Sequence, residues 1–342
     1  TAVRSTVVQH RSLQSSTLSN FLSDLGLCLT ARKGRAIKMS VDNLVKKIKE
    51  TGNPSVAGLD PTIDYVPEYI KEKAFAEYGK GLKGACEAIW EFNKGLIDAL
   101  YDVVPAVKPQ SAFYEMYGLD GEEVLHRTIK YAKEKGLYVI LDVKRNDIGS
   151  TAEAYSKAYI GKTEIEGELF EACPTDSMTV NPYLGTDGIK PFIDDCKAYD
   201  KSVFVLVKTS NPSSGEFQDL KLGDKHLYEI VAEHVNEWNS DTIGESGYGA
   251  AGAVVGATYP EQAAVLRKLM PKSYFLVPGY GAQGGSAKDV KNSFNDDGLG
   301  AIVNSSRGIM CAYKKQGLDG KAFADAARKE AIRMRDELTS VI

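Results

Sequence analysis

Length, composition and charge describe an ordinary globular protein. The chain has 342 residues, of which 43% are hydrophobic and 26% charged, and its formal net charge is −4, so nothing indicates a nucleic-acid partner or an anionic membrane surface. No apolar run approaches the roughly 20 residues that cross a membrane. The five cysteines are scattered and form no C-x-x-C pair, which favours free thiols in a reducing compartment, here the cytoplasm, over disulfides or a zinc site.

Residues 1–38 differ in composition from the rest of the chain. They are rich in Ser and Thr and carry six Lys and Arg residues against the single acid Asp24, as in an organelle transit peptide. Nothing else in the chain indicates an organelle, so we favour a disordered extension, or upstream sequence that precedes a start at Met39. A helical pattern begins just after Met39, and we expect residues 39–342 to form a single domain.

Beyond Met39, short apolar runs alternate with amphipathic segments of helical pattern, among them 121–135, 225–238, 260–270 and 321–338. Strands that alternate with helices predict a parallel sheet, and eight such units predict an α/β fold, the (β/α)8 TIM barrel. A doubly wound open sheet is the alternative, but no Gly-x-Gly-x-x-Gly motif follows the first run. The eight apolar runs are 55–59, 104–107, 138–143, 177–180, 203–207, 253–256, 274–277 and 300–303.

Polar residues follow each of the eight runs. The carboxyl ends of the strands form the catalytic face of such a barrel, whereas independent structural ion pairs would not be expected to gather on one rim. The sequence therefore predicts an active site there. In chain order, the segments are Asp60-Pro61, Lys108-Pro109-Gln110-Ser111, residues 142–147, Asn181-Pro182-Tyr183, Lys208-Thr209-Ser210-Asn211-Pro212, Thr258, residues 278–285, and Asn304-Ser305-Ser306-Arg307-Gly308.

The third run ends in a cluster of charges, Asp142, Lys144 and Asp147. Side chains of a strand alternate between its faces, so Asp142 and Lys144 should point the same way. Burying charge is costly unless it is paired, so the cluster is either a structural ion network or a reaction centre, and its place on the rim favours the second. Lys144, flanked by carboxylates, is suited to donate a proton. Ser150 and Glu153 have the spacing of a capping box, which puts Asp147 in a short loop before a helix.

The loops after the seventh and eighth runs have the features of a phosphate site. Glycine-rich backbone can bring N–H groups close to an anion, and Arg307 adds a guanidinium group. Phosphate sites in these barrels commonly use these two loops. Turn geometry alone is the other explanation for the glycines. The acids of the rim could also hold Mg²⁺, although lysines among them already neutralise their charge.

These segments resemble the motifs of the orotidine 5′-monophosphate decarboxylase family. Asp142-x-Lys144-x-x-Asp147 is similar to the signature of that family, but phosphosugar-processing relatives share this motif. The whole set, in this order, is more specific and spans about residues 41–330. The Thr-Ser-Asn-Pro motif and the long segments after the first and fifth runs resemble the larger, second-type branch. The other matching motifs are Gly58-Leu59-Asp60-Pro61, Lys108-Pro109, Lys208-Thr209-Ser210-Asn211-Pro212, Pro278-Gly279-Tyr280-Gly281-Ala282-Gln283 and Ser306-Arg307-Gly308.

The resemblance implies a homodimeric barrel that converts orotidine 5′-monophosphate to uridine 5′-monophosphate and CO₂, the last step of UMP biosynthesis, without a metal or an organic cofactor. It implies that Asp142 faces the substrate carboxylate and that Lys144 protonates carbon 6 of the pyrimidine. Ser210 would read the pyrimidine edge. The remaining implied roles are ribose binding by Asp60 and Lys108, entry of Asp147, Ile148 and Thr151 into the partner subunit's site, closure over base and phosphate by Gln283, and a grip on the phosphate by Arg307.

Two other functions fit the same pattern. One is a magnesium-dependent phosphosugar decarboxylase or aldolase on the same scaffold. The other is a barrel that binds nucleotides without catalysis, which the intact set of acids and lysines argues against.

Overall fold

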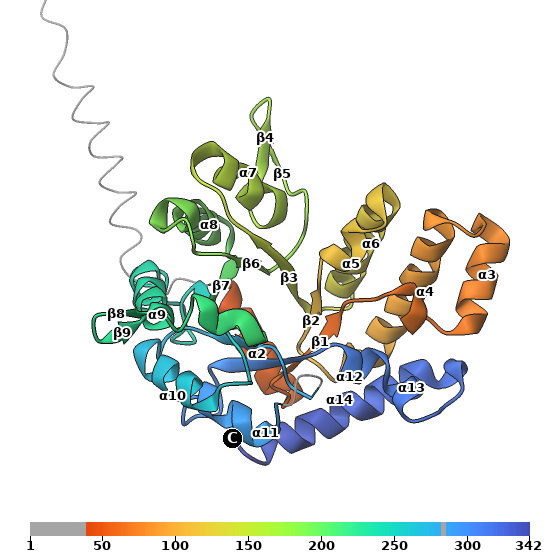
Figure 1. The fold of residues 1–342 in the computed structure, drawn as a ribbon. Coiled ribbons are helices and arrows are strands. Elements are labelled where there is room, and N and C mark those ends of the chain that lie inside the picture. The colour runs from red at the N-terminus through yellow and green to blue at the C-terminus, as the bar shows by residue number, and fades with distance from the viewer. Residues whose placement is uncertain (1–38, 282–284) are drawn as a thin grey trace, which may run out of the picture. The chain divides into compact units, whose positions relative to one another are not determined.

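The computed structural model describes residues 39–281 and 285–342. The extension predicted over residues 1–38 and the predicted site residue Gln283 lie outside the described residues. Within the described part, parallel strands close into a barrel in the order β1-β12-β11-β10-β7-β6-β3-β2 (Figure 1). The barrel strands are β1 Ser55–Leu59, β2 Ala106–Pro109, β3 Tyr138–Arg145, β6 Ser177–Val180, β7 Ser202–Lys208, β10 Ala251–Val255, β11 Phe275–Val277 and β12 Ala301–Ser305.

Each of the eight apolar runs forms one strand of this barrel, so the predicted (β/α)8 fold is confirmed. Most of the strands are buried along their whole length, because a parallel barrel is filled by side chains inside and covered by helices outside. In β3 the first six residues are buried, but Lys144 is exposed and Arg145 partly so. The third strand therefore carries a lysine out of the core at its carboxyl end.

The helices surround the barrel (Figure 1), and the long ones bury an apolar face. In α6, for example, Val124, Leu125, Thr128, Ile129 and Ala132 are buried, a spacing of three and four residues that marks one face of a helix. The four amphipathic segments predicted as helices are confirmed as α6, α9, α10 and α14. The helices are α2 Ser40–Thr51, α3 Glu68–Tyr78, α4 Leu82–Leu100, α5 Ala112–Glu115, α6 Gly118–Glu134, α7 Gly149–Tyr159, α8 Thr186–Tyr199, α9 Leu227–Trp238, α10 Pro260–Leu269, α11 Ala287–Val290, α12 Arg307–Met310, α13 Ala312–Lys315 and α14 Phe323–Thr339.

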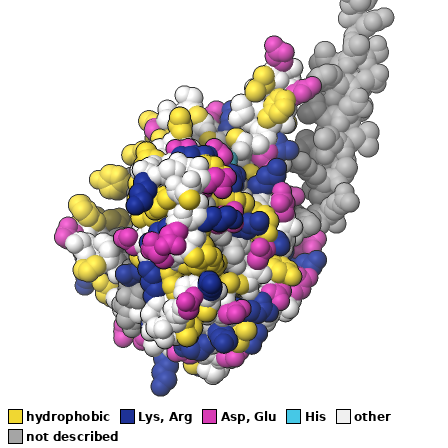
Figure 2. Space-filling view, turned by 90° about the vertical axis from the view of Figure 1, so that its right-hand side faces the viewer, with side chains coloured by type: hydrophobic (Ala, Val, Ile, Leu, Met, Phe, Trp, Pro, Cys, Tyr) yellow, Lys and Arg dark blue, Asp and Glu magenta, His cyan; other side chains and the backbone are white. Residues whose placement is uncertain are grey.

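The outer surface carries charges of both signs. Figure 2 shows basic and acidic side chains interspersed on the face that lies to the right in Figure 1. Oppositely charged side chains also form ion pairs, such as Lys83 with Glu87. In the part of the chain that the structure describes, no helix is long and apolar enough to cross a membrane.

Helix α2 lies against the amino ends of the strands, opposite the polar rim. Its first residue, Ser40, forms hydrogen bonds with Tyr138 (3.0 Å), the first residue of β3, and with Ser202 (2.6 Å), the first residue of β7. Because α2 covers this end, the carboxyl ends of the strands are the end at which a ligand can enter.

Two features of the fold were not predicted, and one prediction was wrong. The antiparallel hairpins β4 Thr163–Ile165 with β5 Glu168–Phe170, and β8 Lys221–Leu222 with β9 Lys225–His226, were missed, because strands of two or three exposed residues are too short for a hydrophobic pattern. The capping box expected at Ser150 and Glu153 does not form. Helix α7 begins at Gly149, with Ile148 as N-cap and no side-chain cap, so Ser150 already lies in the first turn.

Candidate active site

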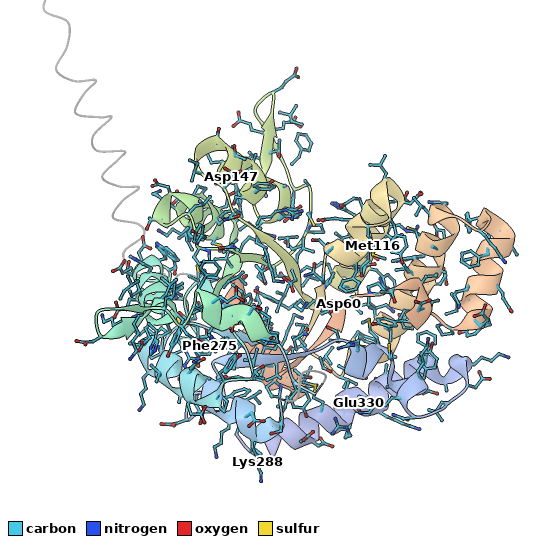
Figure 3. The ribbon with its side chains drawn as sticks, in the orientation of Figure 1. Asp60, Met116, Asp147, Phe275, Lys288 and Glu330 are labelled. Carbon is cyan, nitrogen blue, oxygen red and sulfur yellow. The ribbon has the colours of Figure 1, made fainter. Side chains whose placement is uncertain are left out.

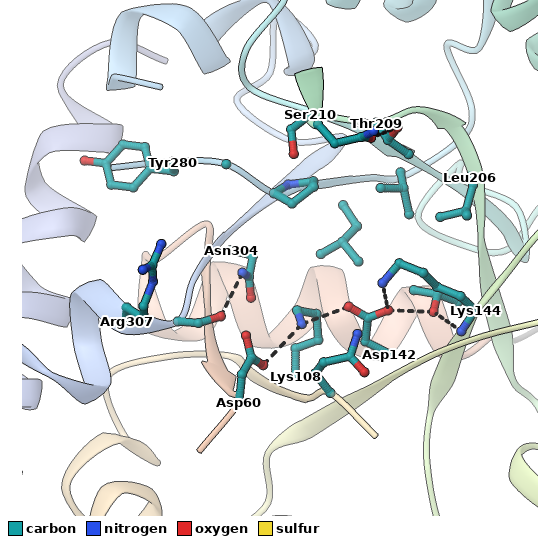
Figure 4. Close-up of a pocket in the computed structure, with 18 of the residues that line it drawn as sticks. Asp60, Lys108, Asp142, Lys144, Leu206, Thr209, Ser210, Tyr280, Asn304 and Arg307 are labelled. Atoms are coloured by element: carbon teal, nitrogen blue, oxygen red, sulfur yellow. Dashed lines mark hydrogen bonds and ion pairs between the residues drawn. The ribbon is translucent and has the colours of Figure 1, made fainter. Parts of the chain in front are cut away.

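The polar rim surrounds a cavity of about 760 Å³ at the carboxyl ends of the strands. A cavity of this size is typical of a site for a small molecule. Residues from opposite sides of the barrel meet in it, as Figure 4 shows. Six of the residues predicted for the site line the cavity, namely Asp60, Lys108, Asp142, Lys144, Ser210 and Arg307.

The floor of the cavity is a chain of alternating charges. Asp142 Oδ1 accepts a hydrogen bond from Lys144 Nζ (2.6 Å), and Oδ2 accepts one from Lys108 Nζ (3.1 Å). Lys108 Nζ also lies 3.6 Å from Asp60 Oδ1. Lys108 and Asp142 are 3% and 8% exposed, so their charges are compensated almost entirely by each other and by their neighbours (Figure 4).

Burial and the neighbouring charges shift the pKa values of Lys108 and Asp142 in opposite directions, and the neighbouring charges have the larger effect. Burial of the Lys108 ammonium lowers its pKa, but the carboxylates of Asp60 and Asp142 more than offset this, and the pKa of Lys108 is above its ordinary value. Burial raises the pKa of Asp142, but the ammonium groups of Lys108 and Lys144 more than offset it, and the pKa of Asp142 lies well below its usual range. Asp142 is therefore an anion at any physiological pH.

The two acids of this floor are already paired with lysines, which bears on the magnesium alternative. Among residues 39–281 and 285–342, no group of three or more His, Cys, Asp or Glu side chains is arranged to hold a metal ion. Ammonium groups within 3.6 Å of both carboxylates would repel a divalent cation at the same place. The donor set therefore fits a cation site poorly.

The prediction that Asp142 and Lys144 point the same way is confirmed by their contact, but the strand between them is irregular. Lys144 has φ 48°, a left-handed conformation that is uncommon for a residue with a side chain. The register of β3 against β6 shifts between Leu141 and Arg145. Thr179 of β6 was not predicted for the site, yet its Oγ1 accepts hydrogen bonds from the backbone N–H groups of Val143 and Lys144.

The opposite wall is formed by the ends of β11 and β12. Asn304 Nδ2 donates to Ser306 Oγ (3.2 Å), and both residues line the cavity together with the exposed Arg307. Gly58 of β1 packs against them so closely that a Cβ atom there would lie 2.0 Å from Ser306 Oγ. Asp60 Oδ1 and Asn304 Oδ1 are buried and accept no hydrogen bond from a described residue. Asn304 Oδ1 is thus an acceptor without a described hydrogen-bond donor, whereas Asp60 Oδ1 has the Lys108 ammonium 3.6 Å away.

Ser210 is held by the long segment that follows β7. Lys208, fully buried, donates to Asp219 Oδ1 (2.8 Å) and Ser214 Oγ (3.1 Å), and Gln218 Oε1 accepts the backbone N–H of Thr209 (2.9 Å). These contacts fold the segment back onto the start of its own loop. Asp219 and Gln218 were not predicted for the site, because nothing in the sequence indicates which distant polar residue closes a loop.

Gly256, just after β10, permits the close approach of the Ser210 loop. A Cβ atom on Gly256 would lie 2.8 to 2.9 Å from the backbone N, Cα and Cβ atoms of Ser210. Contacts this short require the loop to move, so the absence of a side chain at residue 256 is a condition for the position of Ser210.

Three predicted site residues do not line this cavity: Asp147, Ile148 and Thr151. Asp147 Oδ1 accepts the backbone N–H of Ile148 (2.8 Å), and Figure 3 shows Asp147 beside α7, away from Asp60. Ile148 is 55% exposed and borders a separate hollow between α7 and α8. Within one chain, these residues therefore do not join Lys144.

The chain is similar in sequence to proteins of known function. The model of the family described as "Orotidine 5'-phosphate decarboxylase / HUMPS family" matches residues 86–317. The chain is 47% identical to the orotidine 5′-phosphate decarboxylase of Caldicellulosiruptor bescii over 273 residues, which cover 80% of this chain and 90% of that protein.

The chain is also similar to solved structures of OMP decarboxylase and UMP synthase. The Leishmania donovani OMP decarboxylase is 32% identical, with a TM-score of 0.65, over 87% of this chain and 99% of that one. The Leishmania donovani UMP synthase is 34% identical, with a TM-score of 0.66, over 87% of this chain, which spans 57% of the length of that larger protein.

Proposed function

Because the chain belongs to the orotidine 5′-phosphate decarboxylase / HUMPS family, we propose that it converts orotidine 5′-monophosphate to uridine 5′-monophosphate and CO₂, the last step of UMP biosynthesis. The observation that carries this proposal is the Asp60–Lys108–Asp142–Lys144 chain of charges on the floor of the cavity. Relatives that are 47% and 44% identical to the chain are named orotidine 5′-phosphate decarboxylases, which favours this activity over the phosphosugar alternative.

In the proposed reaction, the bond between carbon 6 and the carboxylate breaks and its electron pair stays on carbon 6. The ring cannot delocalise this pair, so the barrier is high, and enzymes remove up to about 23 kcal/mol in such cases. Asp142 faces the substrate carboxylate, and two like charges about 4 Å apart repel by only about 4 kcal/mol at an effective dielectric constant of about 20. Ground-state repulsion is thus too small to account for catalysis.

Most of the rate enhancement would come from the preorganised, water-excluding site as a whole, in which Lys144 stabilises the developing carbanion. The Lys144 ammonium lies 2.6 Å from Asp142, at the point where negative charge develops as CO₂ leaves. A preorganised cation stabilises that charge without reorganisation, and one of its protons then passes to carbon 6. Lys108 and Lys144 supply the positive charge that the reaction needs, so the proposed mechanism involves neither a metal nor an organic cofactor.

The rest of the nucleotide would occupy the walls of the cavity. Asp60, with an oxygen that accepts no hydrogen bond from the described residues, and Lys108 would bind ribose hydroxyls. Ser210 would contact the pyrimidine edge. Arg307 would bind the phosphate, for which a guanidinium fork is well suited, and Gln283 would close over base and phosphate. Binding energy from the phosphate can then serve the reacting centre.

The proposed enzyme is a homodimer in which each site takes residues from both subunits. The support is that Asp147, Ile148 and Thr151 lie outside the cavity of their own chain, although Asp147 is only three residues from Lys144. A second copy would bring them to its neighbour's site. We expect the enzyme in the cytoplasm, because the described cysteines are free thiols, as is usual in a reducing compartment.

A direct assay tests the proposed function. The absorbance of orotidine 5′-monophosphate should fall as the purified protein converts it, with and without a chelator. Lys144→Ala should lower kcat by about 10²- to 10⁴-fold, as is usual for a lost proton donor, while Lys288→Ala, at an exposed position of α11, should not change it. No turnover by the native protein would refute the proposal, and loss of turnover with the chelator would favour the magnesium-dependent alternative.

A further inference from the structure

The hydroxyl group of Thr179 is the centre of a small network beneath the reacting groups. Thr179 belongs to β6, is 1% exposed, and forms three hydrogen bonds. Its Oγ1 donates to Asp142 Oδ1 (2.9 Å) and accepts from the N–H groups of Val143 (3.0 Å) and Lys144 (2.9 Å). A hydroxyl has one donor and two acceptor positions, so all of them are in use and none is left for a ligand.

The two hydrogen bonds from backbone N–H groups to Thr179 take the place of regular pairing between β3 and β6, which is interrupted here. The register of β3 against β6 shifts between Leu141 and Arg145, and the two amides that Thr179 accepts lie in that interval. Lys144 has φ 48° there, one of three positive values among the non-glycine residues that the structure describes. Such a conformation persists only where surrounding contacts hold it, and the hydrogen bond from its N–H group to Thr179 is such a contact.

The same hydroxyl also orients the carboxylate. Asp142 Oδ1 receives hydrogen bonds from Thr179 and Lys144, while Oδ2 faces Lys108. Rotation of the carboxylate would break the bond to Thr179, whose position is fixed by two backbone groups. Thr179 thus couples the backbone of Lys144 to the carboxylate that its ammonium contacts.

We infer that Thr179 is a positioning residue for proton transfer, which holds Lys144 and Asp142 in the geometry that the reaction at carbon 6 requires. The inference rests on the proposed function. Thr179 acts through Lys144, so its loss should affect the chemical step and leave nucleotide binding largely intact. A displacement of about 1 Å in a reacting group can cost about 10²-fold in rate, and a loss in kcat of that order is the expected effect.

Three variants separate this role from a structural one. Thr179→Val removes the hydroxyl and keeps the branched shape, and it should lower kcat about 100-fold while KM and the affinity for uridine 5′-monophosphate change less than about threefold. Thr179→Ser keeps the hydroxyl and should retain kcat within about tenfold of the native value. If Thr179→Val does not fold, Thr179→Ala takes its place, with the same expected loss.

Thr242→Val is the matched control. The Thr242 hydroxyl is also buried, accepts the backbone N–H of Ala250 (3.1 Å) and bonds the side chain of Asn239 (3.0 Å), but it lies just before β10, at the opposite end of the barrel. Its loss should lower the melting temperature about as much as Thr179→Val does and leave kcat unchanged. Equal effects of the two variants on kcat would overturn the inference.

A double-mutant comparison completes the test. Residues that act through one another give non-additive effects, so Thr179→Val should lower kcat little further in a Lys144→Ala background. Full additivity would overturn the inference. If the native protein has no decarboxylase activity, the proposed function fails. If the native protein is active and Thr179→Val has native kcat, the proposed function stands and only the role of Thr179 fails.

Discussion

Replacing Asp142 with Asn tests whether the chain of charges is held together as the geometry implies. The amide keeps the shape of the carboxylate and removes its charge. Lys108 Nζ lies 3.1 Å from Asp142 Oδ2, where two unit charges attract by about 5 kcal/mol at an effective dielectric constant of about 20. Lys108 is 3% exposed and would keep only Asp60, at 3.6 Å. We therefore expect a loss of about 3 to 5 kcal/mol in the free energy of unfolding near neutral pH.

The sign of the pH dependence makes the test specific. In the native protein the pKa of Lys108 is raised, so its contribution to stability is fully present below the unfolded pKa of about 10.4 and is lost as pH rises through the folded value. The lowered pKa of Asp142 gives a contribution that is lost only in acid. Between about pH 7 and about pH 9.5 both native contributions are therefore constant.

In Asp142→Asn, burial of the Lys108 ammonium has a larger effect on its pKa than the remaining carboxylate. Burial of the ammonium is then opposed by one carboxylate instead of two, so we expect the pKa of Lys108 to fall below its unfolded value. The unfolded variant binds more protons than the folded variant in the alkaline range, and its stability rises with pH. The difference in stability between native protein and variant should thus shrink from about pH 7 to about pH 9.5.

Urea unfolding at the two pH values, followed by circular dichroism, measures this difference. Asp176→Asn is the control, because its partner Lys133, 2.6 Å away, has a side chain 33% exposed that water can solvate. That variant should lose less stability, and its loss should not depend on pH in this range. A loss at Asp142 of under about 1 kcal/mol, as for an exposed pair, or a loss that does not depend on pH, would refute the reasoning.

Three further predictions concern the proposed activity. Arg307→Ala should lower kcat/KM for the phosphorylated substrate about 10- to 100-fold, the value of a hydrogen bond to a charged group, and hardly affect phosphate-free orotidine; equal losses would argue against a phosphate contact. Mixing the inactive Lys144→Ala and Asp147→Ala proteins should restore about a quarter of native activity, because half of the randomly formed dimers are hybrids with one intact site; no recovery despite subunit exchange would count against a shared site. Gly256→Ala should raise KM about tenfold by displacing Ser210, and an unchanged KM would contradict the close contact.

Much of the fold could be predicted because the strands of a covered parallel barrel are apolar on both faces. Each of the eight apolar runs therefore stood out, and the polar residues directly after them marked the rim. The same pattern gave Asp60, Lys108, Asp142, Lys144, Ser210 and Arg307, all of which line the cavity. Their order along the chain also carried the resemblance to the family, which the comparisons confirm.

Local rules were less reliable where the backbone is unusual. The capping-box spacing of Ser150 and Glu153 did not place the start of α7, because the chain turns at Gly149, which has φ 53°, and the helix begins there. In the sequence, Thr179 looks like any other residue of a buried strand. Its role depends on a shift in register between β3 and β6, and no residue pattern predicts that shift.

The sequence by itself determined which residue types end each strand, because side-chain chemistry and the spacing of apolar runs are properties of the chain alone. Only the tertiary structure decided which of those residues meet. Parallel pairing of β1 with β2 brings Asp60, at the end of one strand, within 3.6 Å of Lys108 on the next. The left-handed turn at Lys144, held by Thr179 from a neighbouring strand, brings its ammonium to Asp142. Asp147, only three residues further on, is directed away from this cavity, since the loop before α7 leaves the rim. These distances depend on strand order, register and backbone conformation, which are set by the packing of the whole barrel.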